Sequence, residues 1–360
     1  MLEEYFQYEP YQWDQEEKDR MLTGTLKELT RYHDAHCVEY HNFLQATQTD
    51  IERIKHYREI PFFPVRLFKE QDLLSIPREE VYKVMTSSGT SGQRVSKIYV
   101  NQENAMLQQK VMMRILADFW GKKRLPILVV DSPKVLKDRA MFSARGAAVI
   151  GLTMMAKKMI YVLNEDMTLN EEVLDSFMEQ YGDVPFVAFG FTFMVWQHFY
   201  KALKKLPKKY DMSNGYLFTG GGWKKLESEA ISRDDFKKVM RDVCNMGQFV
   251  DHYGMVEQTG CIYAECPCGH LHASIFSDVI IRNPIDFSEC KIGESGVIQV
   301  VSALPHSYPG HSLLTEDEGM VLGVDDCPCG RKGKYIKVIG RMKNAEIRGC
   351  SDTYAAGFQQ

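Results

Sequence analysis

VYKVMTSSGTSGQRVSK, residues 81 to 97, joins an apolar run to a loop of hydroxyls and glycines. Residues 81 to 85 alternate as a strand does, so the loop from Thr86 to Lys97 lies at a strand end, where α/β folds place their ligands. Glycine lets the backbone approach an anion, Ser and Thr supply hydroxyl donors, and Arg94 or Lys97 offsets negative charge. Neither a Walker loop nor a dinucleotide fingerprint is present. The loop is therefore a phosphate-binding loop of another kind or an ordinary polar turn.

Around this loop, apolar patterns predict strands that alternate with helices. Such alternation indicates a mainly parallel sheet with helices on its faces. After residue 243 the pattern becomes strand-rich with short turns. The fold class is therefore α/β, with mixed sheets flanked by helices and a strand-rich part. Helical spacing is found at residues 14–45, 101–119, 170–181 and 224–243, and strand character at residues 127–130 and 184–193.

The composition is that of an ordinary globular chain and excludes several classes of function. Of 360 residues, 44% are apolar and 26% are charged, and the formal net charge of -4 gives no basic surplus for nucleic acid. The most apolar stretch, Val184 to Trp196, is shorter than the roughly 20 residues that cross a bilayer. Residues 1–6 lack the charged and apolar regions of a signal peptide. We therefore expect a cytoplasmic protein of one large or two modest domains, with no membrane span.

Two motifs in the second half of the chain indicate a flat ligand and a metal ion. Gly220, Gly221 and Gly222 end an apolar run just before a predicted helix. They suit either close approach to a flat ligand or a tight strand-to-helix connection. Further along, Tyr253-Gly254-Met255-Val256-Glu257 combines a ring that can stack on a base with an acid that can hold a hard cation.

Five motifs, in this order, resemble the core motifs of the adenylate-forming enzymes, which include acyl-CoA synthetases, adenylation domains and firefly luciferase. Within that superfamily, the segment Pro61 to Lys69 and the short total length resemble the LuxE-type acyl-protein synthetases of bacterial fatty-acid reductase. Phenylacetate-CoA ligases are the nearest relatives by style of motif. The resemblance covers most of the chain from residue 60 onward. The five motifs are residues 87–92, residues 220–222, Tyr253-Gly254-x-x-Glu257, Thr315-Glu316-Asp317 and Gly340-Arg341.

The resemblance implies ATP and Mg²⁺ as cofactors and gives each motif a role. Glu257 would bind Mg²⁺, Asp317 would hold both ribose hydroxyls, and Arg341 would reach the ribose and phosphate at the hinge. In the family a proline and then a lysine follow the loop closely, whereas here Arg94 and Lys97 are the two candidates to neutralise pyrophosphate. The β- and γ-phosphates would be held by Ser87, Ser88, Gly89, Thr90, Ser91 and Gly92, and adenine by Gly220, Gly221 and Gly222 with Tyr253 and Gly254.

By the same resemblance, residues 1–339 form the adenylate-forming domain, and the family's small C-terminal domain is largely absent. Residues 1–60 would be a helical N-terminal segment, and residues 261–330 a strand-rich part. Residues 340–360 would be the hinge and a short tail that carries Cys350. A small domain normally delivers coenzyme A or a carrier thiol, so a thiol within the chain would serve instead.

Six of the nine cysteines lie in the last hundred residues, and four of these form two knuckles. An odd number of cysteines in a chain of this length favours metal binding or catalysis over a disulfide framework. Two Cys-x-Cys-Gly knuckles with histidines indicate tetrahedral zinc in a closed, structural site, whereas the alternative is buried reduced thiols. Cys266, His272, Cys327 and Cys329 resemble the structural zinc site of some phenylacetate-CoA ligase relatives, with Cys268 and His270 as alternates.

Cys350 lies in the polar stretch Glu346-Ile-Arg-Gly-Cys-Ser351, directly after the hinge motif. The adjacent Arg348 favours the thiolate, which is the form that attacks carbonyls. In the acyl-protein synthetases a cysteine close to the C-terminus receives the acyl group, and Cys350 matches in place and setting. Otherwise it is a free surface cysteine.

These features predict an ATP-dependent enzyme that activates a carboxylic acid, for this family a fatty acid, as acyl-adenylate with release of pyrophosphate. The acyl group would pass to Cys350 and then to an acyl-accepting reductase or another protein. Phe189, Phe191, Phe193 and Trp196 line an acyl pocket or belong to the core. Two alternatives remain open: a phenylacetate-type coenzyme A ligase with a truncated C-terminal domain, and a zinc-stabilised nucleotide-binding protein without catalysis.

Overall fold

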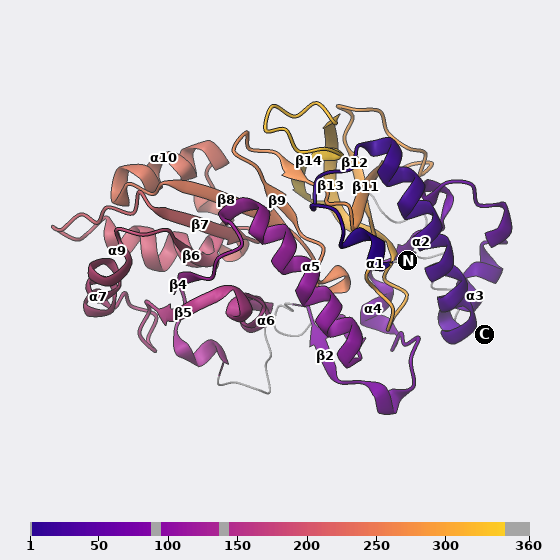
Figure 1. Ribbon diagram of the computed structural model, residues 1–360, viewed down its shortest axis with the longest axis horizontal. Helices are drawn as coiled ribbons and strands as arrows, with labels where there is room; N and C mark the ends of the chain where they lie inside the picture. The colour runs from indigo at the N-terminus through magenta and orange to yellow at the C-terminus, as the bar shows by residue number, and fades with distance from the viewer. Residues whose placement is uncertain (1, 88–94, 137–143, 343–360) are drawn as a thin grey trace. The chain divides into compact units, whose positions relative to one another are not determined.

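The computed structural model describes residues 2–87, 95–136 and 144–342 (Figure 1). Ser88 to Gly92, Arg94 and Cys350 lie outside these ranges. The chain divides into two compact units. The first takes its residues from Met1–Ile115, Gly254–Tyr263 and Cys268–Gln360, and the second from Leu116–Tyr253 and Ala264–Pro267. The division into an adenylate-forming domain of residues 1–339 and a tail of residues 340–360 stays a prediction.

The second unit contains a parallel sheet in the order β8-β7-β6-β4-β5. All of its pairings are parallel, and β4 is buried at every residue, as its continuous apolar run predicts. Because parallel strands end at the same edge, the residues that follow them gather there. The strands are β4 (Leu125–Val129), β5 (Ala156–Tyr161), β6 (Phe186–Phe191), β7 (Gly215–Gly220) and β8 (Gln248–Tyr253).

Helices separate these strands along the chain, which confirms the predicted alternation. The predicted helix over residues 224–243 is wrong at its start, because residues 224–229 form a short 3-10 segment and α10 begins at Arg233. The hydroxyl of Ser232 accepts the amide hydrogen of Asp235 and so caps α10 at this point. The helices of this part are α6 (Ala144–Leu152), α7 (Glu171–Tyr181), α8 (Thr192–Met194), α9 (Lys201–Leu203) and α10 (Arg233–Cys244), with a π-helical turn at Val195–Tyr200. Helix α5 (Gln102–Trp120) belongs to the first unit up to Ile115 and to the second from Leu116.

The first unit is the strand-rich part, with helices contributed by the N-terminal residues. Strands β11, β12, β13, β14 and β10 pair antiparallel in that order, β1 pairs parallel with β13, and β2 and β3 form a separate hairpin. The elements are α1 (Leu2–Tyr5), α2 (Gln15–His36), α3 (Val38–Ala46), α4 (Leu67–Glu70), β1 (Phe63–Pro64), β2 (Lys83–Thr86), β3 (Lys97–Val100), β10 (Leu271–His272), β11 (Ser277–Arg282), β12 (Gly296–Ser302), β13 (Ser312–Val324) and β14 (Lys334–Arg341). Strand β9 (Tyr263–Glu265) belongs to this unit at Tyr263 and to the second unit from Ala264.

A buried ionic cluster connects α2 to the strands of the first unit. Lys18 Nζ lies 3.7 Å from Asp278 Oδ1, and Lys334 Nζ lies 3.4 Å from Asp278 Oδ2. Burial alone would raise the pKa of Asp278, but the two ammonium groups hold it well below its usual range. The side chains of Gln15 and Tyr57 donate further hydrogen bonds to the same carboxylate. The amphipathic helix α2 is thus fixed by charge as well as by apolar burial.

Of the helices described, none combines the length and the apolar character that crossing a bilayer requires.

Candidate active site and metal centre

The glycine triplet lies at the carboxyl edge of the parallel sheet in the second unit. Gly220 ends β7 and is opposite His252 of β8. A Cβ on Gly220 would lie 2.1 Å from His252 Cε1, so only glycine leaves room for this imidazole. Gly221 has φ +74°, which favours glycine, whereas a Cβ on Gly222 would meet nothing within 4 Å. The first two glycines therefore serve the local strand-to-helix geometry, and Gly222 is open at the edge.

The imidazole of His252 is held in one orientation. Its ring stacks on Phe218 at 4.6 Å, and its Nδ1 lies 2.7 Å from the carbonyl oxygen of Thr219. Because a carbonyl can only accept, Nδ1 carries the hydrogen. Burial lowers the pKa of His252, so the ring is neutral near pH 7. The sequence reasoning did not single out His252, although its position between Asp251 and Tyr253 places it beside the predicted nucleotide motif.

A charged network fixes the ends of β7 and β8 in the same unit. Glu265 accepts hydrogen bonds from Arg233 at 2.8 Å and from Lys237 at 2.6 Å. It also accepts the amide hydrogen of Asp251 at 3.1 Å, and Asp251 in turn accepts from the Thr219 hydroxyl at 3.2 Å. Burial would raise the pKa of Glu265, but Arg233 and Lys237 keep it below its usual value. The segment that ends at Tyr253 is therefore supported by paired charges.

Glu257 is a buried carboxyl group in the first unit. It lies in the 3-10 turn Val256–Gln258, and only 5% of its surface is exposed. The side-chain amide of Gln258 fixes this turn by donating to the carbonyls of Gly310 at 2.8 Å and Val300 at 3.2 Å. Burial raises the pKa of Glu257, and the hydroxyl of Ser96 and the ammonium of Lys69 partly oppose that rise. A buried carboxylate of this kind favours a bound cation.

Asp317 and Arg341 are paired neighbours on β13 and β14 of the first unit. The Arg341 guanidinium donates to Glu316 Oε2 at 2.6 Å, and Lys69 Nζ lies 3.8 Å from the same oxygen. Glu316 therefore pairs with two cationic side chains, and it directly precedes Asp317, the predicted ribose ligand. Sequence reasoning quoted Glu316 only as part of a motif and gave Lys69 no role. Their pairing joins segments that are far apart in the chain, so no local pattern reveals it.

Lys97 and Ser87 lie where the hairpin β2-β3 opens into the hydroxyl loop. Ser87 Oγ accepts the amide hydrogen of Ser96 at 2.9 Å, which fastens the two arms of the loop together. Lys97 Nζ lies 3.9 Å from Asp72 Oδ1 and is 54% exposed. Both residues therefore frame the loop, and Lys97 remains accessible to an anion.

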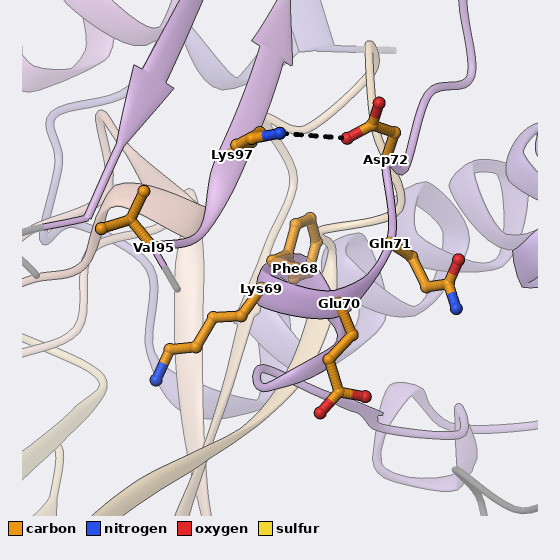
Figure 2. Close-up of a pocket in the computed structure, with 7 residues that line it drawn as sticks. All are labelled: Phe68, Lys69, Glu70, Gln71, Asp72, Val95 and Lys97. Carbon is orange, nitrogen blue, oxygen red and sulfur yellow. Dashed lines mark ion pairs between the residues drawn. The ribbon is translucent and has the colours of Figure 1, made fainter. Parts of the chain in front are cut away.

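A pocket of about 420 Å³ opens beside Lys97 in the first unit (Figure 2). The 54% exposed Lys97 and the 29% exposed Lys69 give it two cationic groups. In Figure 2, Lys69 extends on the side of Val95, away from Asp72 and Lys97. The pocket is lined by Phe68, Lys69, Glu70, Gln71, Asp72, Val95 and Lys97.

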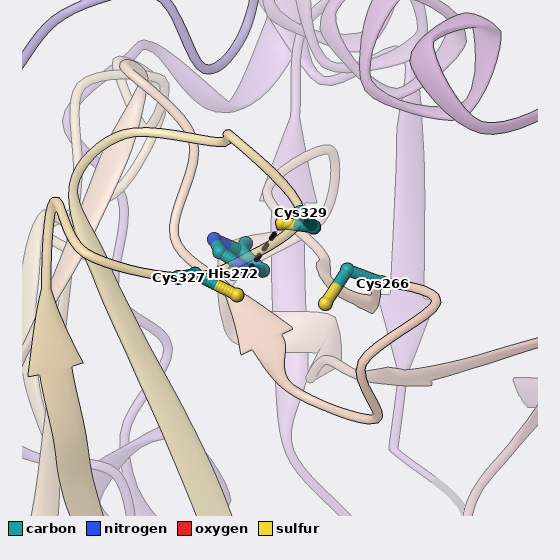
Figure 3. Close-up of side chains that lie close together, drawn as sticks. All are labelled: Cys266, His272, Cys327 and Cys329. Carbon is teal, nitrogen blue, oxygen red and sulfur yellow. Dashed lines mark hydrogen bonds between the residues drawn. The ribbon is translucent and has the colours of Figure 1, made fainter.

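The two cysteine knuckles meet in one cluster (Figure 3). The ligand atoms of Cys266, His272, Cys327 and Cys329 all lie within 4.8 Å of one another. Tetrahedral zinc with sulfur at about 2.3 Å needs sulfur atoms about 3.8 Å apart, so a small contraction would accommodate the ion.

The histidine of this cluster also fits a metal ligand. Its Nε2 lies 3.4 Å from Cys329 Sγ, and its Nδ1 is buried without a hydrogen-bond partner among the described residues. Burial, followed by the charge of Arg331, lowers the pKa of His272 to about 3, so the ring is neutral. Of the alternates, Cys268 is exposed, and His270 Nδ1 lies 3.3 Å from Cys327 Sγ while its ring stacks on Tyr335.

Comparison with known proteins gives a family match over almost the whole chain. The family described as "Acyl-protein synthetase, LuxE" matches residues 3–359. A "Long-chain-fatty-acid--luciferin-component ligase" of Vibrio harveyi is 23% identical over 97% of this chain and 91% of its own length. A protein of the same description from Aliivibrio fischeri is 21% identical over 99% of this chain and 93% of its own length.

The solved structures supply a likeness of fold. A 2-hydroxyisobutyryl-CoA ligase in complex with 2-HIB-AMP and CoA has a TM-score of 0.72 and 14% sequence identity. The alignment covers 93% of this chain and 70% of that one. The likeness confirms the predicted α/β fold of adenylate-forming ligases.

Proposed function

The chain belongs to the acyl-protein synthetase (LuxE) family, and from this membership we propose that it activates a fatty acid with ATP and transfers the acyl group to a protein thiol. The observation that carries the proposal is the family match over residues 3–359, which includes all five nucleotide motifs and Cys350. The described geometry is consistent with it, since Glu257, Asp317 and Arg341 lie in the first unit with charged neighbours. The family match favours transfer to protein over both alternatives, coenzyme A ligation and nucleotide binding without catalysis.

In the first half-reaction a carboxylate oxygen attacks the α-phosphorus of ATP. The bond from that phosphorus to the β-phosphate oxygen breaks, and pyrophosphate leaves. Negative charge grows on the leaving group, so fixed positive charge is more useful here than a general base. Glu257 would hold Mg²⁺, which neutralises phosphate charge when it is bound. Lys97, Ser87 and the loop residues Ser88 to Gly92 would hold the phosphates, and Asp317 and Arg341 would hold the ribose side.

In the second half-reaction a thiolate attacks the acyl carbon of the mixed anhydride. The bond from that carbon to the phosphate oxygen breaks, AMP leaves and a thioester forms. We assign the thiol to Cys350, whose neighbour Arg348 stabilises the thiolate. An acyl-accepting protein would then take the acyl group from the enzyme. Gly220, Gly221, Gly222, Tyr253 and Gly254 would contact adenine in this scheme.

Acid-dependent exchange of labelled pyrophosphate into ATP tests the first half-reaction directly. We expect exchange with at least one acid from a panel of increasing chain length, because adenylation is reversible while pyrophosphate is present. If no acid supports exchange, although ATP binds, the chain is a nucleotide-binding protein without catalysis. If acyl-CoA forms rapidly when coenzyme A is added, and does so in a Cys350→Ser variant, the chain is a coenzyme A ligase.

We propose further that Cys266, His272, Cys327 and Cys329 bind one structural zinc ion. Three thiolates and one imidazole complete a tetrahedral shell, so this site would hold no substrate. The supporting observations are the mutual proximity of the four side chains and the position of His272 Nε2, which lies 3.4 Å from Cys329 Sγ.

Replacing Cys327 with serine should remove the zinc and lower the thermal midpoint by roughly 5–10 °C, because metal-binding free energy adds to folding free energy. Elemental analysis of purified protein should show one zinc per wild-type chain and almost none in the variant. Cys268→Ser is the matched control, since Cys268 is the exposed cysteine of the first knuckle and should keep the metal. Equal metal loss in both variants, or a wild-type chain without zinc, would contradict the assignment.

A further inference from the structure

Lys69 is a cation of the first unit that the nucleotide motifs do not include. It lies on the short helix α4. The neighbouring Phe68 anchors this helix, because only 1% of Phe68 is exposed. Lys69 itself is 29% exposed and lines the pocket in Figure 2. Its nearest ionic partner among the described residues is Glu316, at 3.8 Å, which is beyond hydrogen-bonding distance. An ammonium carries three donors, so Lys69 has capacity for an anion.

The groups around Lys69 are those that we assign to the nucleotide and to Mg²⁺. Glu316 is already bonded to Arg341 at 2.6 Å, so Lys69 is the weaker of its two partners. Lys69 also acts electrostatically on the buried Glu257. Within the part of the chain that the structure describes, the second cation of the pocket, Lys97, likewise has a long ion pair, 3.9 Å from Asp72. Two cations whose described ion pairs are long therefore line one pocket, and one of them interacts electrostatically with the carboxylate that we assign to the metal.

We propose that Lys69 binds the pyrophosphate end of ATP in the pocket whose lining it shares with Lys97, an inference that rests on the proposed adenylation. Phosphate oxygens would replace the long pair to Glu316 by charge-assisted hydrogen bonds, which are shorter and stronger. Because charge grows on pyrophosphate as the bond to the α-phosphorus breaks, the same lysine would stabilise the transition state more than bound ATP. Lys69 is thus assigned as a substrate-binding residue of the first half-reaction.

The test compares Lys69→Met with Arg66→Met. Arg66 precedes α4, is 55% exposed and pairs with Glu70 at 2.8 Å, so its replacement removes the same charge outside the pocket lining. We expect Lys69→Met to lower kcat/KM for ATP in pyrophosphate exchange by about 10- to 100-fold, with kcat reduced as well as KM raised. Calorimetric titration with magnesium pyrophosphate should show a similar loss of affinity. Arg66→Met should stay within about twofold, and Lys69→Arg should recover part of the loss.

A second ligand separates direct binding from an indirect effect through Glu257 and Glu316. A sulfamoyl analogue of the acyl-adenylate has no pyrophosphate group, so Lys69→Met should bind it as the wild type does. Equal weakening of the analogue and of magnesium pyrophosphate would overturn the proposal, as would unchanged pyrophosphate affinity. If the wild type supports no exchange with any acid, the proposed function fails, whereas the pyrophosphate titration still decides the role of Lys69.

Discussion

Glu257→Gln should reduce acid-dependent pyrophosphate exchange by about 100-fold or more, which is among the largest effects that the structure predicts. The carboxylate is the one group in the buried turn Val256–Gln258 that we assign to Mg²⁺, and an amide has no charge to offer the ion. The exchange assay at several Mg²⁺ concentrations is the measurement. Excess Mg²⁺ should rescue the variant only in part, because a neutral oxygen ligand remains.

The melting temperature of the Glu257→Gln variant is the control measurement, because it shows whether the fold is retained. Burial raises the pKa of Glu257 above its ordinary value of 4.5, so the stability linked to its protonation is fully present below 4.5 and is lost as the pH rises through the raised pKa. Glutamine stays neutral and keeps the shape of the side chain. The variant should therefore melt at or above the wild-type temperature at pH 8. Exchange within tenfold of wild type would place the metal ligand elsewhere, and a collapsed melting temperature would leave Glu257 with a structural role.

Cys350→Ser should abolish the covalent acyl-enzyme while leaving pyrophosphate exchange within about twofold of wild type. A serine hydroxyl is not ionised near neutral pH, whereas we propose that Cys350, two positions after Arg348 in the sequence, attacks the acyl-adenylate as a thiolate. Intact-mass measurement after incubation with ATP and a fatty acid should show one acyl adduct on the wild type and none on the variant. Hydroxylamine should remove the wild-type adduct, as expected for a thioester.

The described cysteines are poor rivals for this acyl group. Burial raises the pKa of Cys37, Cys244 and Cys261 to about 12, which keeps them protonated. Cys268→Ser and Cys290→Ser remove the more accessible thiols and serve as controls, since both variants should still form the adduct. An adduct retained in Cys350→Ser would refute the assignment and leave adenylation intact.

Strands β4 and β6 of the parallel sheet could be predicted because each is a continuous apolar run, whereas β5 and β8 contain charged residues and were not predicted. The start of α10 could not be predicted in the same way, since the charged pattern from residue 224 continues into the helix, whereas the Ser232 cap sets the boundary. The strand predicted to reach residue 193 ends at Phe191, and the chain then turns into α8. Phe189 and Trp196, suggested for an acyl pocket or the core, are 2% and 9% exposed and are core residues.

Part of the candidate site was visible as local motifs, and part depends on tertiary contacts. The two cysteine knuckles predicted a metal cluster, and the resemblance to phenylacetate-CoA ligase relatives supplied the four side chains that the structure gathers. Glu316 on β13 forms ion pairs with Lys69 on α4 and Arg341 on β14. These residues are far apart in the sequence, so no periodic pattern in the sequence predicts the pairs. Gly220 could be singled out from the sequence, but one reason why the position requires glycine could not. That reason is the ring of His252, which lies against Gly220 because β7 and β8 are neighbouring strands.

The buried cluster of Lys18, Asp278 and Lys334 constrains how sequences of this family can diverge. Loss of Asp278 leaves two ammonium groups uncompensated in the core, at a cost of about 3–5 kcal/mol, whereas joint replacement of all three residues by apolar side chains of similar volume is often neutral. A substitution of Asp278 is therefore deleterious unless substitutions of the two lysines accompany it. Because the effect of one substitution depends on the others, we expect the three positions to change together or to stay unchanged together. They are far apart in the sequence, since Lys18 lies on α2, Asp278 on β11 and Lys334 on β14. Covariation among the three positions across relatives is the evolutionary record that this contact should leave.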